Sequence, residues 1–149
     1  MQGIVYKPDK TKSIENFVDA LFASEWNTEW IDEPSSVMSR TGYVIMYANF
    51  PIIWCSKLQT EISLSTRENE YVVLSQLLRD VKPLIGMLKV VTATIKTDEI
   101  IPIVHCTIFE ENRGCIDLVE TPKIRLGPKC IAIKDHHFRS HVRDKTISI

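Results

Sequence analysis

The sequence predicts an α/β protein in which helices pack against a mixed β-sheet. Three apolar, β-rich runs precede the first long helical pattern, so strands and helices do not alternate strictly along the chain. A fourth apolar run follows that pattern, and the predicted order is β-β-β-α-β-α-α. A chain of 149 residues, 44% hydrophobic and 25% charged, is typical of one domain with one core, which we place at residues 1–149.

The first three predicted strands span residues 14–20, 42–48 and 52–55. A polar segment over residues 24–40 has no sustained period and is expected to be a loop. A hairpin is expected around residues 49–51, because the proline there cannot donate to a strand ladder. Both runs of this hairpin are almost continuously apolar, which predicts strands covered on both faces.

The first long helix is predicted to begin at residues 65–68, Ser-Thr-Arg-Glu, which have the spacing of a capping box. In such a box the serine hydroxyl and the glutamate carboxylate each satisfy one free backbone amide. Pro83 lies inside the helical pattern, so a kink or a helix boundary is expected near Lys82. Apolar residues recur at steps of three and four positions and direct one stripe of the helix toward a core: Leu74, Leu77, Val81, Leu84 and Leu88.

The last part of the chain is predicted to hold a buried strand over residues 100–109 and a short helix over 112–119. A connection over residues 121–128 leads to a surface helix over 132–144. Residues 121–149 carry seven Lys and Arg against two Asp, whereas the rest of the chain has an excess of acids. This basic segment is expected to face a polyanion such as nucleic acid.

The four cysteines are widely spaced, which predicts reduced thiols in an intracellular protein, cytoplasmic or nuclear. His105 and Cys106 are adjacent in a predicted strand and should point to opposite faces, which does not favour a zinc site. No apolar stretch approaches the ~20 residues of a membrane span, and no charged-then-apolar leader is visible, so no membrane partner is expected.

Carboxylates stand where predicted strands and helices end. Asp19 ends the first strand, Glu110 and Glu111 end the strand over 100–109, and Glu70 lies on or beside the apolar stripe of the long helix. Each acid taken singly could be solvated, and Glu70 could simply favour the positive end of the helix dipole. The alternative is a shared site for a hard divalent cation, which prefers oxygen ligands.

Five short segments, taken together with their order and spacing along the chain, carry a resemblance to a known family: Val18–Ala23, Ser39–Val44, Trp54–Gln59, Leu64–Tyr71 and Phe109–Asn112. With them the chain resembles the ribonuclease H domain of copia-type retrotransposon polyproteins over nearly its whole length. The resemblance implies a ribonuclease H-like fold, with three leading strands and then alternating helices and a parallel strand. It also implies Mg²⁺-dependent hydrolysis of the RNA strand of RNA–DNA hybrids, and a reverse transcriptase domain in a parent polyprotein.

The same resemblance implies two Mg²⁺ ions held by four carboxylates, one ion activating water and the other stabilising the leaving oxygen. Asp19 matches the first acid of the family and Glu70 the second, and Glu111 stands where the family has an Asp. The fourth acid would lie beyond residue 149, so the last helix is expected to be missing and the last strand to be missing or left short. Four basic residues are expected to contact nucleic-acid phosphates: Lys129, Lys134, Arg139 and Arg143.

Departures from the family pattern leave two functions open. Glu111 places its carboxylate one methylene further out than an Asp would, and Mg²⁺ requires nearly ideal octahedral distances. Leu21 replaces the second Asp of the first motif, and Cys130 replaces a histidine near the basic segment. The chain is therefore either a ribonuclease with impaired activity or a non-catalytic relic that retains the fold and binds nucleic acid.

Overall fold

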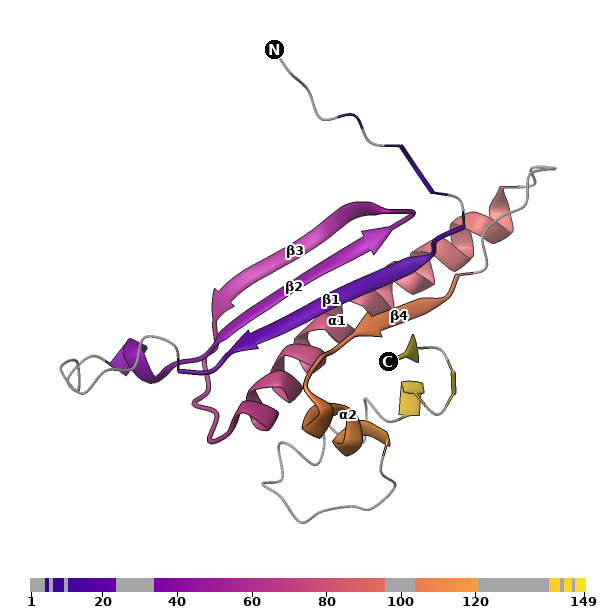
Figure 1. Ribbon diagram of the computed structural model, residues 1–149. Helices are drawn as coiled ribbons and strands as arrows, with labels where there is room; N and C mark the ends of the chain where they lie inside the picture. The colour runs from indigo at the N-terminus through magenta and orange to yellow at the C-terminus, as the bar shows by residue number, and fades with distance from the viewer. Residues whose placement is uncertain are drawn as a thin grey trace.

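The computed structural model describes residues 5, 7–9, 11–23, 34–95, 104–120, 140–142, 144–145 and 147–149. Within these ranges five strands form one mixed sheet in the order β3-β2-β1-β4-β5, with a long helix beside it (Figure 1). This confirms the predicted α/β class with a mixed sheet. The elements are β1 (Ile14–Leu21), β2 (Arg40–Tyr47), β3 (Phe50–Leu58), α1 (Thr66–Thr94), β4 (Cys106–Phe109), α2 (Arg113–Glu120) and β5 (Ile147–Ser148), and a 3-10 helix, Pro34–Val37, precedes β2.

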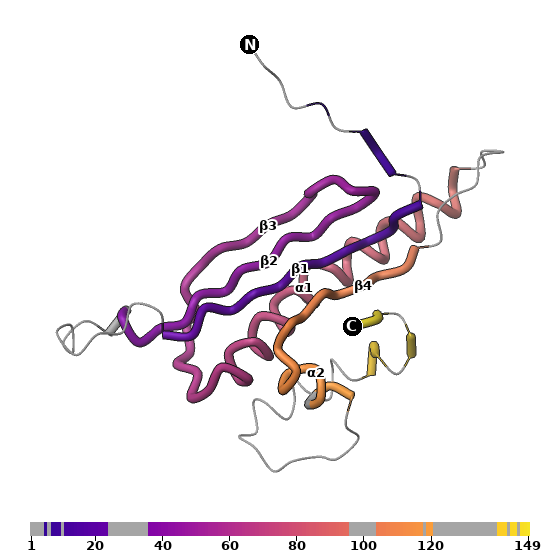
Figure 2. Tube along the Cα trace, viewed as in Figure 1, coloured from indigo at the N-terminus to yellow at the C-terminus, as the bar shows by residue number. Residues whose placement is uncertain are grey.

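The sheet combines antiparallel and parallel pairs. β1 pairs antiparallel with β2, which pairs antiparallel with β3. On its other edge β1 pairs parallel with β4, so the chain crosses over from β3 through α1 to reach β4 (Figure 2). Because β1 and β4 are parallel, their C-terminal ends lie side by side. The chain continues from the C-terminal end of β4 into α2 (Figure 1).

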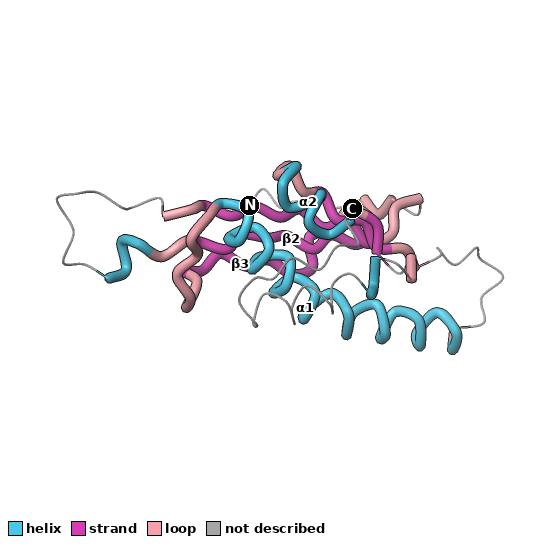
Figure 3. Tube along the Cα trace, turned by 90° about the horizontal axis from the view of Figure 1, so that it is seen from below, coloured by secondary structure: helices cyan, strands magenta, loops and turns pink. Residues whose placement is uncertain are grey.

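The core lies between α1 and one face of the sheet (Figure 3). Alternate residues of the strands are buried on that face, and α1 contributes a buried stripe at helical spacing, which is the pattern expected of a one-sided core. The most deeply buried hydrophobic side chains are Ile14, Ile45, Tyr71, Val73, Leu74, Leu77, Val81 and Ile108. No helix in the described ranges is long and apolar enough to span a membrane.

The predicted β2–β3 hairpin is confirmed, with its turn at Ala48 and Asn49, which have positive φ angles of 49° and 68°. Pro51 lies inside β3 and not in the turn, and it is tolerated because β3 is an edge strand. The expectation that both strands are covered on both faces is wrong. Trp54 is 72% exposed, because among the described elements α1 covers only the opposite face.

The predicted start of the long helix is confirmed. Ser65 Oγ accepts a hydrogen bond from the Glu68 amide at 3.2 Å, and Glu68 Oε2 accepts one from the Leu64 amide at 2.8 Å. The boundary expected near Lys82 is wrong, because α1 continues through Pro83 to Thr94. Pro83 itself is exposed, and buried side chains on either side of it anchor the helix to the sheet.

The strand predicted over residues 100–109 is confirmed for 106–109, and residues 100–103 lie outside the described ranges. The predicted short helix is confirmed as α2. The last strand, expected to be missing or left short, is present as the two-residue β5, which pairs parallel with β4, and Ile147 is buried against the core. Of the helix predicted over 132–144, residues 140–142 are helical, and most of the others lie outside the described ranges.

Candidate active site

Three of the acids line one cleft at the shared end of β1 and β4. The cleft has a volume of about 370 Å³, and its lining residues are Phe17, Val18, Asp19, Phe109, Glu110 and Glu111. The arrangement follows from the pairing of the two strands, because Phe17 is the register partner of Phe109 and each acid stands just beyond this pair. The strand-end carboxylates that the sequence singled out are thus brought together.

Glu70 approaches the same region from the first turns of α1. Its side chain is 93% buried, since only 7% of the residue is exposed. The backbone amide of Ala20, the residue after Asp19, donates a hydrogen bond to the Glu70 carboxylate. Its Oε2 atom is buried and has no hydrogen-bond partner among the described residues. The helix therefore holds a buried carboxylate against the end of β1.

Electrostatics link Glu70 to the acids of the cleft. Burial raises the pKa of Glu70 to about 8, and repulsion from Glu110 and then from Asp19 adds to the increase. Glu111 contributes a smaller repulsion, and the hydrogen bond from Ala20 opposes all of these effects. Like charges raise a carboxyl pKa appreciably only when they are close, so the four acids share one neighbourhood.

Glu110 ends the predicted strand together with Glu111, but the family resemblance did not select it as a ligand. Its Oε1 atom accepts a hydrogen bond from the Asn112 amide at 2.8 Å, while its Oε2 atom is buried without a partner in the described part of the chain. Burial raises the pKa of Glu110, against the opposing hydrogen bond from Asn112. Glu111, which the family resemblance selected, is exposed. Strand alternation could have indicated the difference, because Glu110 shares the parity of the buried residues Cys106 and Ile108.

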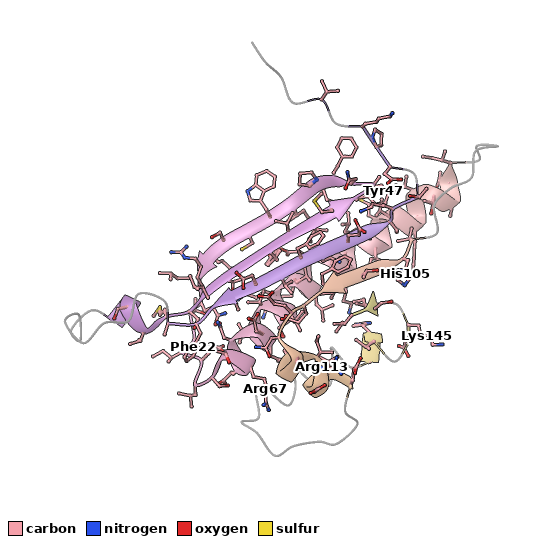
Figure 4. All side chains as sticks on the ribbon, viewed as in Figure 1. Phe22, Tyr47, Arg67, His105, Arg113 and Lys145 are labelled. Atoms are coloured by element: carbon pink, nitrogen blue, oxygen red, sulfur yellow. The ribbon has the colours of Figure 1, made fainter. Side chains whose placement is uncertain are left out.

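Two residues of the helices border the acids. Cys115 of α2 is fully buried, and burial together with the charges of Glu110 and Glu70 raises the pKa of its thiol, which stays protonated. Arg67 lies at the beginning of α1 beside α2, and it lowers the pKa of that thiol (Figure 4).

The four acids have the oxygen ligands that a hard divalent cation prefers, but their side chains are not placed so that they could bind one. All four acids offer oxygen, the ligand that Mg²⁺ prefers, and one buried oxygen each of Glu70 and Glu110 has no hydrogen-bond partner among the residues that the structure describes. As the side chains stand, however, no three Asp, Glu, His or Cys residues of the described ranges are grouped so that they could hold a metal ion. Binding a cation would therefore require the carboxylates to turn toward one another.

The remaining predicted site residues cannot be placed beside the cleft. The phosphate contacts expected of Lys129, Lys134, Arg139 and Arg143 lie outside the described residues. His105 is exposed, and its ring nitrogens lie 3.3 Å from Thr107 Oγ1 and 3.0 Å from Ser148 Oγ. The thiols of Cys55, Cys106 and Cys115 are free, and Cys130 is not described.

Similarity to known proteins extends over almost the entire chain. It is 24% identical over 147 residues, or 99% of its length, to the retrovirus-related Pol polyprotein from transposon RE1 of Arabidopsis thaliana. It is 23% identical over the same length to the corresponding polyprotein from transposon RE2 of that plant. No protein-family model and no solved structure matches the chain. The chain is thus distantly related to retrovirus-related Pol polyproteins, and it spans 9% of the length of each of these relatives.

Proposed function

We propose that this chain is the ribonuclease H-like domain of a retrotransposon Pol polyprotein, and that it hydrolyses the RNA strand of RNA–DNA hybrids with Mg²⁺. The observation that carries the proposal is Glu70, a residue only 7% exposed, whose Oε2 atom has no hydrogen-bond partner in the described part of the chain and which is influenced by three further acids. The distant relation to Pol polyproteins supports the proposal. So does the mixed sheet whose parallel strands β1 and β4 end at the acids.

The ligands would be Asp19, Glu70 and the pair formed by Glu110 and Glu111. Bound Mg²⁺ supplies an activated water and charge stabilisation of the scissile phosphate. The protein's own part is to position the acids, and the Ala20 amide fixes Glu70 against β1 for this purpose. Without a cation the acids repel a phosphate group, so substrate binding at the cleft should depend on the divalent ion.

Hydrolysis should be slow, because the third acid departs from the family pattern. Glutamate stands at both strand-end positions, 110 and 111, and its side chain is one methylene longer than that of aspartate, so it would hold an ion in a different position. A misplacement of about 1 Å can cost roughly 100-fold in rate. The open arrangement of the acids agrees with this expectation, since they must move before they can bind a cation.

A second function is favoured by the same arrangement. If the acids do not close on a cation, the domain would bind hybrid duplex without cutting it, through phosphate contacts from Lys129, Lys134, Arg139 and Arg143. The affinity would then fall steeply as salt is raised, because released counterions dominate such binding. Measuring hybrid binding across a salt series tests this, and an affinity that does not change with salt would contradict it.

The ribonuclease proposal is tested by cleavage of a hybrid labelled on its RNA strand, in Mg²⁺ and in Mn²⁺. Glu70→Gln should reduce the rate by about 100-fold or more, since a charged metal ligand is lost while side-chain size is kept. Glu120→Gln, an exposed acid at the end of α2, is the control and should leave the rate unchanged. Equal cleavage by the unmodified protein and by Glu70→Gln would contradict the proposal.

A further inference from the structure

We infer that Gln59 is a positioning residue, whose side chain joins the first turn of α1 to β2 and thereby holds the Glu70 carboxylate against the end of β1. Gln59 directly follows β3 and ends the segment Trp54–Gln59, which carries part of the family resemblance. Neither that resemblance nor the proposed function gives it a role. The inference rests on the proposed function, because Glu70 belongs to the proposed site.

The hydrogen bonds of Gln59 reach three separate parts of the chain. The residue is only 2% exposed, and its backbone amide donates to the Ser39 carbonyl at 2.8 Å. Its side-chain Nε2 donates to Thr41 Oγ1 at 3.2 Å and to the backbone carbonyl of Asn69 at 3.5 Å, the longest of these contacts. Its Oε1 accepts a hydrogen bond from Ser63 Oγ at 3.2 Å. One buried amide thus connects β2, the loop before α1 and the first turn of α1.

The partners of Gln59 lie next to the two residues that join Glu70 to β1. Asn69 immediately precedes Glu70 in α1. Thr41 is the register partner of Ala20, and the Ala20 amide donates a hydrogen bond to the Glu70 carboxylate. The bridge from Thr41 through Gln59 to Asn69 therefore runs beside the bond between Ala20 and Glu70. Both connections fasten the same turn of α1 to the same end of the sheet.

The chemistry of the bridge requires an amide. A glutamine side chain has two N–H donors and one carbonyl acceptor, whereas an ionised glutamate only accepts and a methionine of similar length does neither. Burial and the repulsion of neighbouring acids both disfavour a charged Glu70 in its present position. Without the bridge, the first turn of α1 would be free to carry this carboxylate away from β1 and toward solvent.

Hydrogen exchange at the Ala20 backbone amide, followed by NMR, reports directly on the position of Glu70. Even-numbered amides of β1 point toward β4, as the hydrogen bond from the Ile14 amide to the His105 carbonyl shows. β4 pairs with β1 only as far as Phe17. Ala20 lies beyond that pair, so its protection from exchange depends on the Glu70 carboxylate.

Gln59→Met keeps the length of the side chain and removes its hydrogen bonds. It should speed exchange at Ala20 at least about fivefold, the equivalent of one net hydrogen bond. The control is Ile45→Val, a conservative substitution in the core beneath β2, which lowers global stability without touching the bridge. It should change exchange at Ala20 by less than about fivefold, because local opening and not global unfolding governs that amide.

The same variants give a kinetic readout in the cleavage of hybrid. Gln59→Met should lower kcat at least about tenfold and leave KM within about twofold, because a small displacement of Glu70 affects the reacting atoms and not the wider contacts with substrate. Ile45→Val should leave both constants unchanged.

An acceleration at Ala20 of less than about fivefold in Gln59→Met would overturn the inference, and so would an equal acceleration in Ile45→Val. Circular dichroism checks that the variants fold. Should Gln59→Met not fold, Gln59→Glu is judged by the same criteria, since it keeps the acceptor for Ser63 and loses both donated bonds. A lack of cleavage by the unmodified protein would contradict the proposed function alone, because exchange at Ala20 decides the role of Gln59 without cleavage.

Discussion

Glu70 is the residue on which the candidate site depends. Its side chain is 93% buried among acids, an arrangement that costs stability in a protein without a compensating cation. The sequence could indicate that Glu70 lies near the apolar stripe of a helix, because its spacing from Leu74 is one helical turn. It could not indicate that Glu70 is buried or which charge affects it most, since the burial arises from the packing of α1 against the sheet and the strongest repulsion comes from Glu110, which follows β4.

The stability of the metal-free protein should fall as pH rises from 4.5 to about 8. Below this range Glu70 is protonated in both the folded and the unfolded chain. Within it the unfolded chain releases the proton, while the folded chain, whose Glu70 pKa is raised to about 8, retains it. The folded state then binds more protons, so the free energy of unfolding decreases as pH increases.

Glu70→Gln removes this dependence and should stabilise the metal-free protein at pH 8 by about 1–3 kcal/mol. Urea denaturation in the presence of a chelator, at both ends of the pH range, measures the effect. Glu110, whose pKa is also raised by burial, leaves a smaller pH dependence in this variant. Glu120→Gln, at an exposed position, is the control variant. An identical pH slope in the unmodified protein and in Glu70→Gln would show that Glu70 titrates normally.

The long helix α1 shows where local sequence signals suffice and where they do not. The capping box placed its start correctly, because the Ser65 and Glu68 side chains satisfy backbone amides with no help from the rest of the fold. Pro83 did not end the helix, because Val81 and Ile85 are buried in the core on either side of it. Tertiary packing thus overrode a strong local signal.

A single glycine in α1 gives a direct measure of helix propensity. Gly86 is exposed, and a Cβ atom added there would have no heavy atom within 4 Å. Gly86→Ala should therefore raise the free energy of unfolding by about 0.5–1 kcal/mol, because alanine loses less backbone entropy than glycine in a helix.

The matched variant is Gly114→Ala in α2, where the added Cβ would lie 3.1 Å from Arg67 Nε and 3.3 Å from Asn112 Oδ1. Its gain should be smaller than that of Gly86→Ala, because neighbouring side chains must shift. Urea denaturation of both variants at one pH makes the comparison. A larger gain at Gly114 than at Gly86 would contradict the packing described for the two helices.

Taken as a whole, the described molecule has a core on one side of its sheet. The register aligns Trp54, Val44, Phe17 and Phe109 in one row across four strands on the face opposite α1. The Phe17 and Phe109 rings stack with centroids 4.9 Å apart and line the acidic cleft. The apolar runs correctly predicted strands, but hydrophobicity alone does not reveal what covers each face, so the expectation of a two-sided sheet was wrong.

Substitutions on the exposed face of the sheet and in the core beneath it should lower the free energy of unfolding by different amounts. Trp54→Thr should change the free energy of unfolding by less than about 0.5 kcal/mol, because the indole is 72% exposed. Leu77→Ala, at a fully buried position beneath the sheet, should cost about 2–5 kcal/mol. Denaturant unfolding compares the two, and a Trp54→Thr cost as large as that of Leu77→Ala would mean that the second face is also packed.

The central proposal is that Asp19, Glu70, Glu110 and Glu111 lie together at a cost that a bound divalent cation would relieve. The most direct test is the free energy of unfolding at pH 8 with a chelator and with saturating Mg²⁺, for the unmodified protein and for Glu70→Gln. Mg²⁺ should stabilise the unmodified protein, by about 2.7 kcal/mol at 100 times the dissociation constant, and have little effect on Glu70→Gln. Equal stabilisation of both proteins, or of neither, would contradict the claim.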